Sequence, residues 1–148
     1  MDKKNNVVAF SSDHAGFELK ENLKQFFIEK GYEIVDLGPS NGVDSVSYAE
    51  QGKKLSDYMT ENGVEKGIAV CGTGLGISYA LNRHKGIRAA RVTSVEDAHL
   101  AKQHNNANVL VFGGRQVSGD FAREMTQEWL NTEFEGGRHL SRIEELDK

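Results

Sequence analysis

Cys71-Gly72-Thr73-Gly74-Leu75-Gly76-Ile77-Ser78 directly follows the apolar run Gly67 to Val70, and this junction decides the fold class of the 148-residue chain. The run is typical of a buried parallel strand, and the glycines favour a tight turn into a helix. Outward from this point, short apolar runs alternate with amphipathic segments five times. The alternation predicts a single-domain α/β protein over residues 1–148, a three-layer α/β/α Rossmann-like sandwich with a five-stranded parallel sheet and a C-terminal helical tail.

The expected elements follow from hydrophobic periodicity, helix caps and glycine breaks. Strands are predicted at 7–10, 33–37, 67–70, 87–92 and 109–112. One helix is predicted between the first two strands, and two more at 48–62 and 118–133. Another runs from the glycine turn through residue 81, and a further one follows an N-cap at Ser94. A charged tail over 136–148 ends the chain. Ligands of such sheets bind outside the carboxyl ends of the strands, so the residues there are the candidates for chemistry.

Composition excludes several classes of function. The net charge of −4 provides no positive field for nucleic acid or an anionic membrane surface. The apolar runs fall far short of a membrane span, and residues 1–6 are not followed by the apolar segment of a signal peptide. A single cysteine allows neither an internal disulfide nor a cysteine-based zinc site, and we therefore expect a cytoplasmic protein.

The glycine-rich stretch after the third strand predicts an anion site. Glycines at 72, 74 and 76 allow successive backbone N–H groups to converge at a helix N-terminus. The stretch lacks the third glycine of a dinucleotide fingerprint and the lysine of a Walker loop. Cys71 is either a small buried hydrophobe or, beside converging N–H groups, a thiolate base.

Polar residues at two other junctions allow two interpretations each. Asp13-His14 follows the first strand, where Asp13 is either a helix N-cap or a ligand-binding carboxylate. His104-Asn105 precedes the fifth strand, where Asn105 is a candidate helix C-cap. In the tail, Arg138 and Arg142 lie four residues apart, a spacing that suits either a phosphate clamp or pairing with nearby glutamates.

Together these motifs resemble one family. The stretches at 13–16, 71–78 and 104–108 and the sequence Gly136-Gly137-Arg138-His139 are similar, in order and spacing, to the ribose-5-phosphate isomerase B family. That family also includes the galactose-6-phosphate isomerase subunits. The resemblance extends from Val7 to Glu145.

The resemblance implies an aldose–ketose isomerase of the pentose phosphate pathway that interconverts ribose 5-phosphate and ribulose 5-phosphate through an enediolate, without cofactor or metal. It implies three catalytic residues: Cys71 as the base, Thr73 as a proton shuttle and His104 in ring opening. The remaining implied residues bind the substrate: Asp13, His14, Tyr48, Gly72, Gly74, Leu75, Gly76, Asn105, Arg115, Arg138 and Arg142. The implied assembly is a homodimer, with a tetramer as the larger alternative, whose sites are shared between subunits because the tail arginines reach into the neighbour.

One departure from the family leaves the sugar open. The family commonly has Asp-Tyr-Pro before the second helix, whereas this chain has Ser47-Tyr48-Ala49. The loss of the acid removes an acceptor for sugar hydroxyls, and the loss of proline frees the backbone. Two alternatives therefore stand beside the pentose phosphate: an isomerase of a six-carbon sugar phosphate (allose or galactose 6-phosphate), or a non-catalytic sugar-phosphate-binding module.

Overall fold

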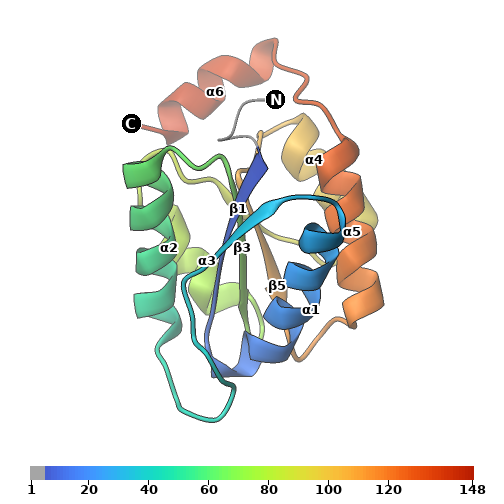
Figure 1. The fold of residues 1–148 in the computed structure, drawn as a ribbon. Coiled ribbons are helices and arrows are strands. Elements are labelled where there is room, and N and C mark those ends of the chain that lie inside the picture. Colours follow the sequence, from blue (N-terminus) through green and yellow to red (C-terminus); the bar gives the residue numbers. More distant parts are fainter. Residues whose placement is uncertain (1–5) are drawn as a thin grey trace.

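A five-stranded parallel sheet forms the centre of the molecule (Figure 1). The computed structural model describes residues 6–148, so most of the amino-terminal stretch considered above for a signal peptide lies outside the described residues. The strand order is β2-β1-β3-β5-β4. The strands are β1 (Val7–Ser12), β2 (Glu33–Asp36), β3 (Lys66–Cys71), β4 (Ala89–Arg91) and β5 (Val109–Gly113).

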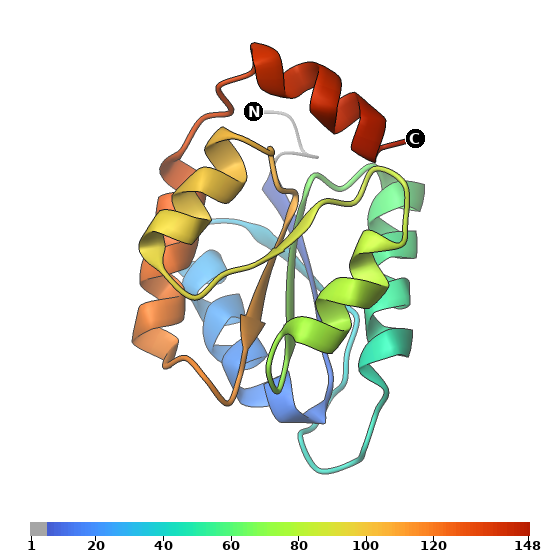
Figure 2. The same ribbon diagram turned by 180° about the vertical axis from the view of Figure 1, so that it is seen from behind.

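Helices cover both faces of the sheet, as predicted (Figures 1 and 2). They are η2 (His14–Gly16), α1 (Phe17–Glu29), α2 (Tyr48–Asn62), α3 (Leu75–Asn82), α4 (Val95–Gln103), α5 (Gly119–Asn131) and α6 (Arg138–Leu146). Helices α1, α4 and α5 pack on one face, α2 and α3 pack on the other, and α6 lies across the edge where the strands begin. Within residues 6–148, no helix has the length and apolar character that a membrane crossing needs.

The central strands are continuously apolar because each one contributes to two cores. In β1, Val8 and Phe10 point to the α1/α4/α5 side, and Ala9 points to the α2/α3 side. The same alternation repeats in β3, where Ile68 and Val70 face the first core, and in β5. All of these side chains are fully buried, which is the pattern of a parallel strand covered on both faces.

Three serines begin helices as N-caps. The Ser94 hydroxyl accepts the N–H of Asp97 at 3.0 Å, which confirms the cap predicted for α4. Ser118 accepts the N–H of Phe121 in the same way. Ser47, the residue that departs from the family pattern, accepts the N–H groups of the second and third residues of α2. Its hydroxyl therefore defines the start of a helix whose bounds match the prediction.

The fourth strand is shorter than predicted. The N–H of Arg88 donates to the side chain of Asn108 at 2.8 Å instead of joining the sheet ladder, so β4 begins at Ala89. The Arg88 guanidinium instead binds both oxygens of Asp147, each at 2.7 Å, and Ile143 of α6 is buried. These contacts dock the tail as the predicted helix.

Candidate active site

The loops after β1, β3 and β5 converge at the carboxyl edge of the sheet and are joined by backbone hydrogen bonds. The N–H of Asp13 donates to Val70 at 3.1 Å, and the N–H groups of Gly114 and Arg115 donate to Cys71 and Gly72 at 2.8 and 3.0 Å. The chain reverses its winding between the adjacent strands β1 and β3. Ligands of open α/β sheets bind at such a switch point.

Cys71 lies at the centre of this convergence. Its side chain is 3% exposed and belongs to the core between the sheet and the helices α2 and α3. Its sulfur accepts the N–H of Gly74 at 3.2 Å. Gly74 has φ +80°, and a Cβ there would lie 3.0–3.1 Å from the Phe112 backbone and the Arg91 side chain, so the turn requires glycine. The residue is a buried small side chain, and it also presents its thiol to a backbone donor.

The other residues of the loop make contacts of their own. The Thr73 hydroxyl accepts the N–H of Leu75 at 3.2 Å, which leaves its own proton available for donation. Arg115 lies beside Gly72, since a Cβ there would be in ordinary contact, at 3.4 Å, with the guanidinium. At Gly76 a Cβ would lie within 2.5–2.8 Å of the Tyr48 ring, so this glycine allows Tyr48 to pack against the start of α3.

Asp13 and His14 each make a local contact. Asp13 is 7% exposed, and its carboxylate accepts the N–H of Gly16 at 3.0 Å, which confirms the predicted N-cap, here of the short helix η2. His14 Nδ1 accepts the N–H of Val46 at 3.3 Å and so joins the loop before α2 to this edge. Both side chains therefore flank the Cys71 loop.

The remaining candidates lie at the opposite edge of the sheet, where the strands begin, which we call the amino edge. His104 ends α4 and Asn105 follows it, just before β5 begins, while Arg138 and Arg142 lie on α6 (Figure 2). The register pairs Cys71 with the last residue of β5, so about 13 Å of strand separates the two edges. A single chain does not bring these four residues to Cys71.

The proposed C-cap role of Asn105 is wrong. His104 itself is the C-cap of α4, and its N–H donates to Leu100. The left-handed residue that reverses the chain is Asn106, at φ 46°. Either asparagine suits this conformation by residue type, so the sequence did not distinguish them.

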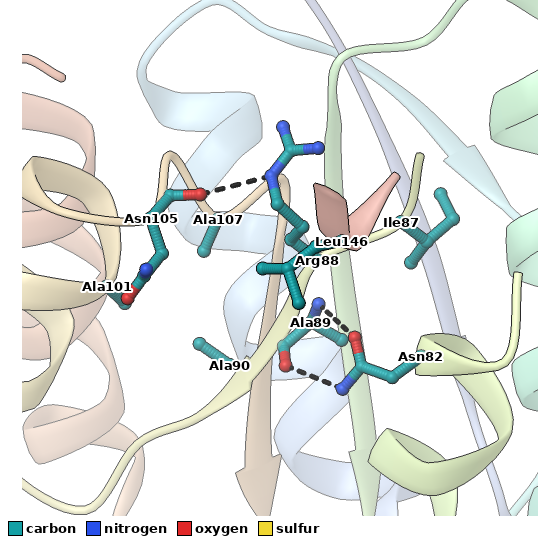
Figure 3. Close-up of a pocket in the computed structure, with 9 residues that line it drawn as sticks. All are labelled: Asn82, Ile87, Arg88, Ala89, Ala90, Ala101, Asn105, Ala107 and Leu146. Carbon is teal, nitrogen blue, oxygen red and sulfur yellow. Dashed lines mark hydrogen bonds between the residues drawn. The ribbon is translucent and has the colours of Figure 1, made fainter. Parts of the chain in front are cut away.

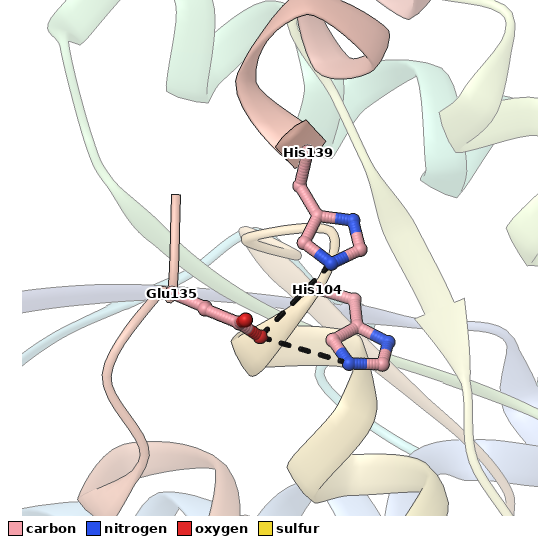
Figure 4. Close-up of side chains that lie close together, drawn as sticks. All are labelled: His104, Glu135 and His139. Carbon is pink, nitrogen blue, oxygen red and sulfur yellow. Dashed lines mark ion pairs between the residues drawn. The ribbon is translucent and has the colours of Figure 1, made fainter. Parts of the chain in front are cut away.

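Two histidines and a glutamate form a cluster at the amino edge (Figure 4). The rings of His104 and His139 stack with centroids 4.5 Å apart. Glu135 Oε2 lies 3.9 Å from Nε2 of His104 and 4.0 Å from Nε2 of His139. The His139 side chain is only 11% exposed, and its buried Nε2 has no hydrogen-bond partner within residues 6–148.

This cluster has the donor set of a metal site but a positive environment. Two imidazoles and a carboxylate are zinc ligands by type, and their donor atoms lie within 4.8 Å of one another. Burial, and then the charge of Arg138, lower the pKa of His139; His104 and Arg142 also lower it, whereas Glu135 raises it. The positive charges of Arg138 and Arg142 oppose a bound cation and favour an anion. Arg138 pairs with Glu135 at 3.8 Å, not with the glutamates that follow it in α6.

A pocket of about 280 Å³ lies beside this cluster, between α6 and the edge strand β4 (Figure 3). Its walls include four alanines, Ile87 and Leu146. Arg88, which enters it, is committed to Asp147 and to the carbonyl of Asn105 at 3.0 Å. The side chains around the pocket therefore help to hold α6 in place. Sequence reasoning missed Arg88 and Glu135, although Glu135 lies i,i+3 from Arg138 directly before the paired glycines.

The sequence model of the Ribose/Galactose Isomerase family matches residues 8–146. Ribose-5-phosphate isomerase B of Escherichia coli is 40% identical over 141 residues, which cover 94% of this chain and 93% of that protein. A ribose 5-phosphate isomerase from Thermotoga maritima has a crystal structure with a TM-score of 0.91 at 44% identity, covering 95% of this chain and 97% of that one. The structure of the Mycoplasma genitalium enzyme with bound ribulose-5-phosphate has a TM-score of 0.90 at 36% identity, and the match covers 95% of this chain and 93% of that one.

Proposed function

The chain belongs to the ribose/galactose isomerase family of sugar-phosphate isomerases, and from this premise we propose that it interconverts ribose 5-phosphate and ribulose 5-phosphate. The observation that carries the proposal is the thiol of Cys71, which accepts a backbone N–H at the point where three loops converge. A binding module needs a phosphate clamp but no such thiol. The ribulose-5-phosphate bound to the Mycoplasma genitalium enzyme supports the pentose as substrate.

The proposed chemistry is a proton transfer between two neighbouring carbons. The Cys71 thiolate removes the C2 proton of the open-chain aldose, and the electron pair moves to form an enediolate. The backbone N–H groups of the Gly72–Gly76 loop stabilise the charge that develops on the two oxygens. The Thr73 hydroxyl, which is free to donate, moves a proton between O1 and O2, and the thiol returns its proton to C1. Atoms and electrons balance without an oxidant or a reductant.

The residues of the amino edge supply the other half of this site. His104 opens the sugar ring, Asn105 contacts the sugar, and Arg138 and Arg142 bind the phosphate. The Arg138 side chain is 64% exposed, and within residues 6–148 its guanidinium makes only a long contact with Glu135 at 3.8 Å, so it is accessible to an anion. Because one chain keeps these residues away from Cys71, the amino edge of a second copy completes the site.

Exposed apolar side chains support this assembly. Tyr48, Leu75 and Tyr79 lie near the Cys71 edge with 38–62% of their surfaces exposed. Leu140 and Leu146 lie on α6 at 50% and 66% exposure. Exposed apolar groups beside each half-site suit an interface between copies. In a two-fold symmetric dimer, each contact of one edge with the other occurs twice, so two complete sites result.

The choice of sugar is tested by direct assay. Purified protein is given ribose 5-phosphate, allose 6-phosphate and galactose 6-phosphate in separate reactions without added metal, before and after treatment with EDTA. We expect the highest kcat/KM with ribose 5-phosphate and no effect of EDTA. Preference for a six-carbon substrate would assign the Ser47-Tyr48-Ala49 change to sugar selection. Absence of turnover with all three would favour the binding module, and loss on chelation would contradict metal-free catalysis.

A further inference from the structure

We infer that Arg91 is a positioning residue for Cys71, acting through the peptide bond between Thr73 and Gly74. Its effect on turnover rests on the function proposed above, whereas its effect on the reactivity of the thiol does not. Arg91 lies outside the motifs that carry the family resemblance. It lies at the end of β4, the outermost strand on that side of the sheet.

A continuous set of hydrogen bonds connects Arg91 to the thiol. Its Nε–H donates to the carbonyl oxygen of Thr73 at 3.1 Å, and an Nη2–H donates to Gln116 Oε1 at 2.7 Å. The N–H at the other end of the same peptide unit, that of Gly74, donates to Cys71 Sγ at 3.2 Å. The guanidinium and the thiol therefore bind the two ends of one peptide group.

The fold makes room for this arrangement at two glycines. Strand β5 lies between β4 and β3, so the Arg91 side chain must reach past the end of β5. That end is Gly113, where a Cβ would lie 2.8 Å from the Thr73 carbonyl oxygen and 3.0 Å from Gln116 Oε1. At Gly74 a Cβ would lie 3.1 Å from Cγ of Arg91. A side chain at either glycine would displace the groups that form the bridge.

The physical effect has two parts. A hydrogen bond from a charged donor polarises the carbonyl, and polarisation along a chain of hydrogen bonds makes the N–H at the other end a better donor to a thiolate. Gln116 holds the guanidinium, so the peptide keeps the orientation in which the Gly74 N–H points at the sulfur. A donor that is already oriented requires no reorganisation when the charge forms.

The test uses the single cysteine of the chain as its own reporter. The rate of alkylation by iodoacetamide is measured on the full-length protein for wild type, Arg91→Met and Arg123→Met. Arg123 is a matched control: its Nε and Nη2 also donate two hydrogen bonds, to Asn22 on α1, away from the site. At neutral pH we expect alkylation of Arg91→Met to be about three- to tenfold slower than in wild type and unchanged in the control. The difference should shrink at alkaline pH, where every thiol ionises.

Equal alkylation rates in Arg91→Met and Arg123→Met would overturn the inference. A faster rate in Arg91→Met would also overturn it, because Cys71 is only 3% exposed and the loss of a residue that merely ties β4 to its neighbours would let iodoacetamide reach the thiol more often. Two further variants test the inference if Arg91→Met does not fold. Arg91→Lys retains one charged donor and should restore part of the rate. Gln116→Leu releases the guanidinium and should slow alkylation by a smaller factor, and a rate equal to wild type would also count against the inference.

Turnover provides a second readout. With ribose 5-phosphate, Arg91→Met should lower kcat by about five- to tenfold and change KM less than about twofold, because the peptide acts on the reacting carbons and not on the phosphate. An increase in KM with unchanged kcat would make Arg91 a substrate-binding residue and refute the inference. If the wild type turns over no sugar phosphate, the proposed function fails, whereas the alkylation comparison still decides the role of Arg91.

Discussion

Cys71 packs its side chain in the core between the sheet and the helices α2 and α3, while its sulfur accepts the Gly74 N–H at the carboxyl edge. The glycine spacing in the sequence predicts converging N–H groups there, and the structure shows one of them, that of Gly74, on the sulfur. It could not reveal that the three glycines have different tasks. Gly74 adopts a left-handed conformation, whereas Gly76 accommodates the Tyr48 ring. Those tasks depend on neighbours that only the folded chain supplies.

Replacement of the thiol is the first prediction at this scale. Cys71→Ala should lower kcat by about 10²–10⁴-fold or more, because the base that moves the proton is removed. Affinity for the sugar phosphate should be nearly unchanged, since the phosphate contacts lie elsewhere. Steady-state kinetics and calorimetric binding measure the two effects. Turnover close to that of wild type would show that another group is the base.

His104→Ala separates ring opening from isomerisation. Ribose 5-phosphate is mostly a closed ring and must be opened, whereas ribulose 5-phosphate cannot close into a furanose. The variant should therefore lose much more kcat with the aldose than with the ketose. The initial rates in the two directions are compared under the same conditions. Equal losses would assign His104 to the proton transfer itself or to packing against His139.

At the level of elements, the sequence predicted best where a cap and a periodicity coincide. Helix α2 has the predicted bounds because Ser47 defines its start and Gly63, in a left-handed conformation, its end. The bounds of β4 were predicted less well. An edge strand has hydrogen bonds to only one neighbouring strand, and the side chain of Asn108 replaces part of that ladder. A long-range partner of this kind leaves no local signal in the sequence.

Strand β2 and the loop after it are held by a charge cluster that the sequence did not reveal. The fully buried Lys20 donates to Asp36 and to the Pro39 carbonyl, both at 2.8 Å, and Lys24 contacts the other Asp36 oxygen at 2.6 Å. Burial alone would raise the pKa of Asp36, but hydrogen bonds from Lys20 and Lys24 outweigh it, and the pKa is lowered. The ionised carboxylate therefore stabilises the folded chain.

Asp36→Asn should lower the free energy of unfolding by about 2–4 kcal/mol at neutral pH, because the buried Lys20 ammonium loses its nearest carboxylate and keeps only the Pro39 carbonyl and Glu21 at 3.6 Å. The contribution of a carboxylate with a lowered pKa is present above its unfolded value near 3.8 and is lost as the pH falls through the folded value. The variant and wild type should therefore converge in strong acid. Urea titrations from neutral to acid pH measure this. Asp57→Asn, which removes an exposed pair with Lys53, is the control and should change little.

Helix α6 carries the proposed phosphate clamp on a docked element. Arg138→Ala should raise KM by roughly ten- to a hundredfold, because a hydrogen bond to a charged group contributes about 1.5–3 kcal/mol. The melting temperature should change little, since this side chain is 64% exposed. Arg123→Ala, which removes a side chain that joins α5 to α1 away from the site, controls for the loss of one positive charge. An unchanged KM would remove Arg138 from the clamp.

For the whole molecule, the sequence motifs did not show that one chain keeps two groups of site candidates at opposite edges of the sheet. The motifs at 13–16 and 71–78 follow strands and converge at the carboxyl edge, as predicted from parallel topology. The motifs at 104–108 and 136–139 precede a strand or begin the tail, and they meet at the amino edge. Each proposed site therefore combines the Cys71 edge of one copy with the His104 edge of another.

Subunit complementation tests this claim most directly. The experiment mixes equal amounts of two proteins that are inactive at low substrate: Cys71→Ala and the double variant Arg138→Ala/Arg142→Ala. Subunit exchange is verified by mass spectrometry, and ribose 5-phosphate turnover is then measured. Shared sites predict recovery of about one quarter of wild-type activity, because half of the dimers are mixed and each regains one intact site. A mixture as inactive as its parents after full exchange would mean that Cys71 and the arginines serve the same chain, which would contradict the shared site.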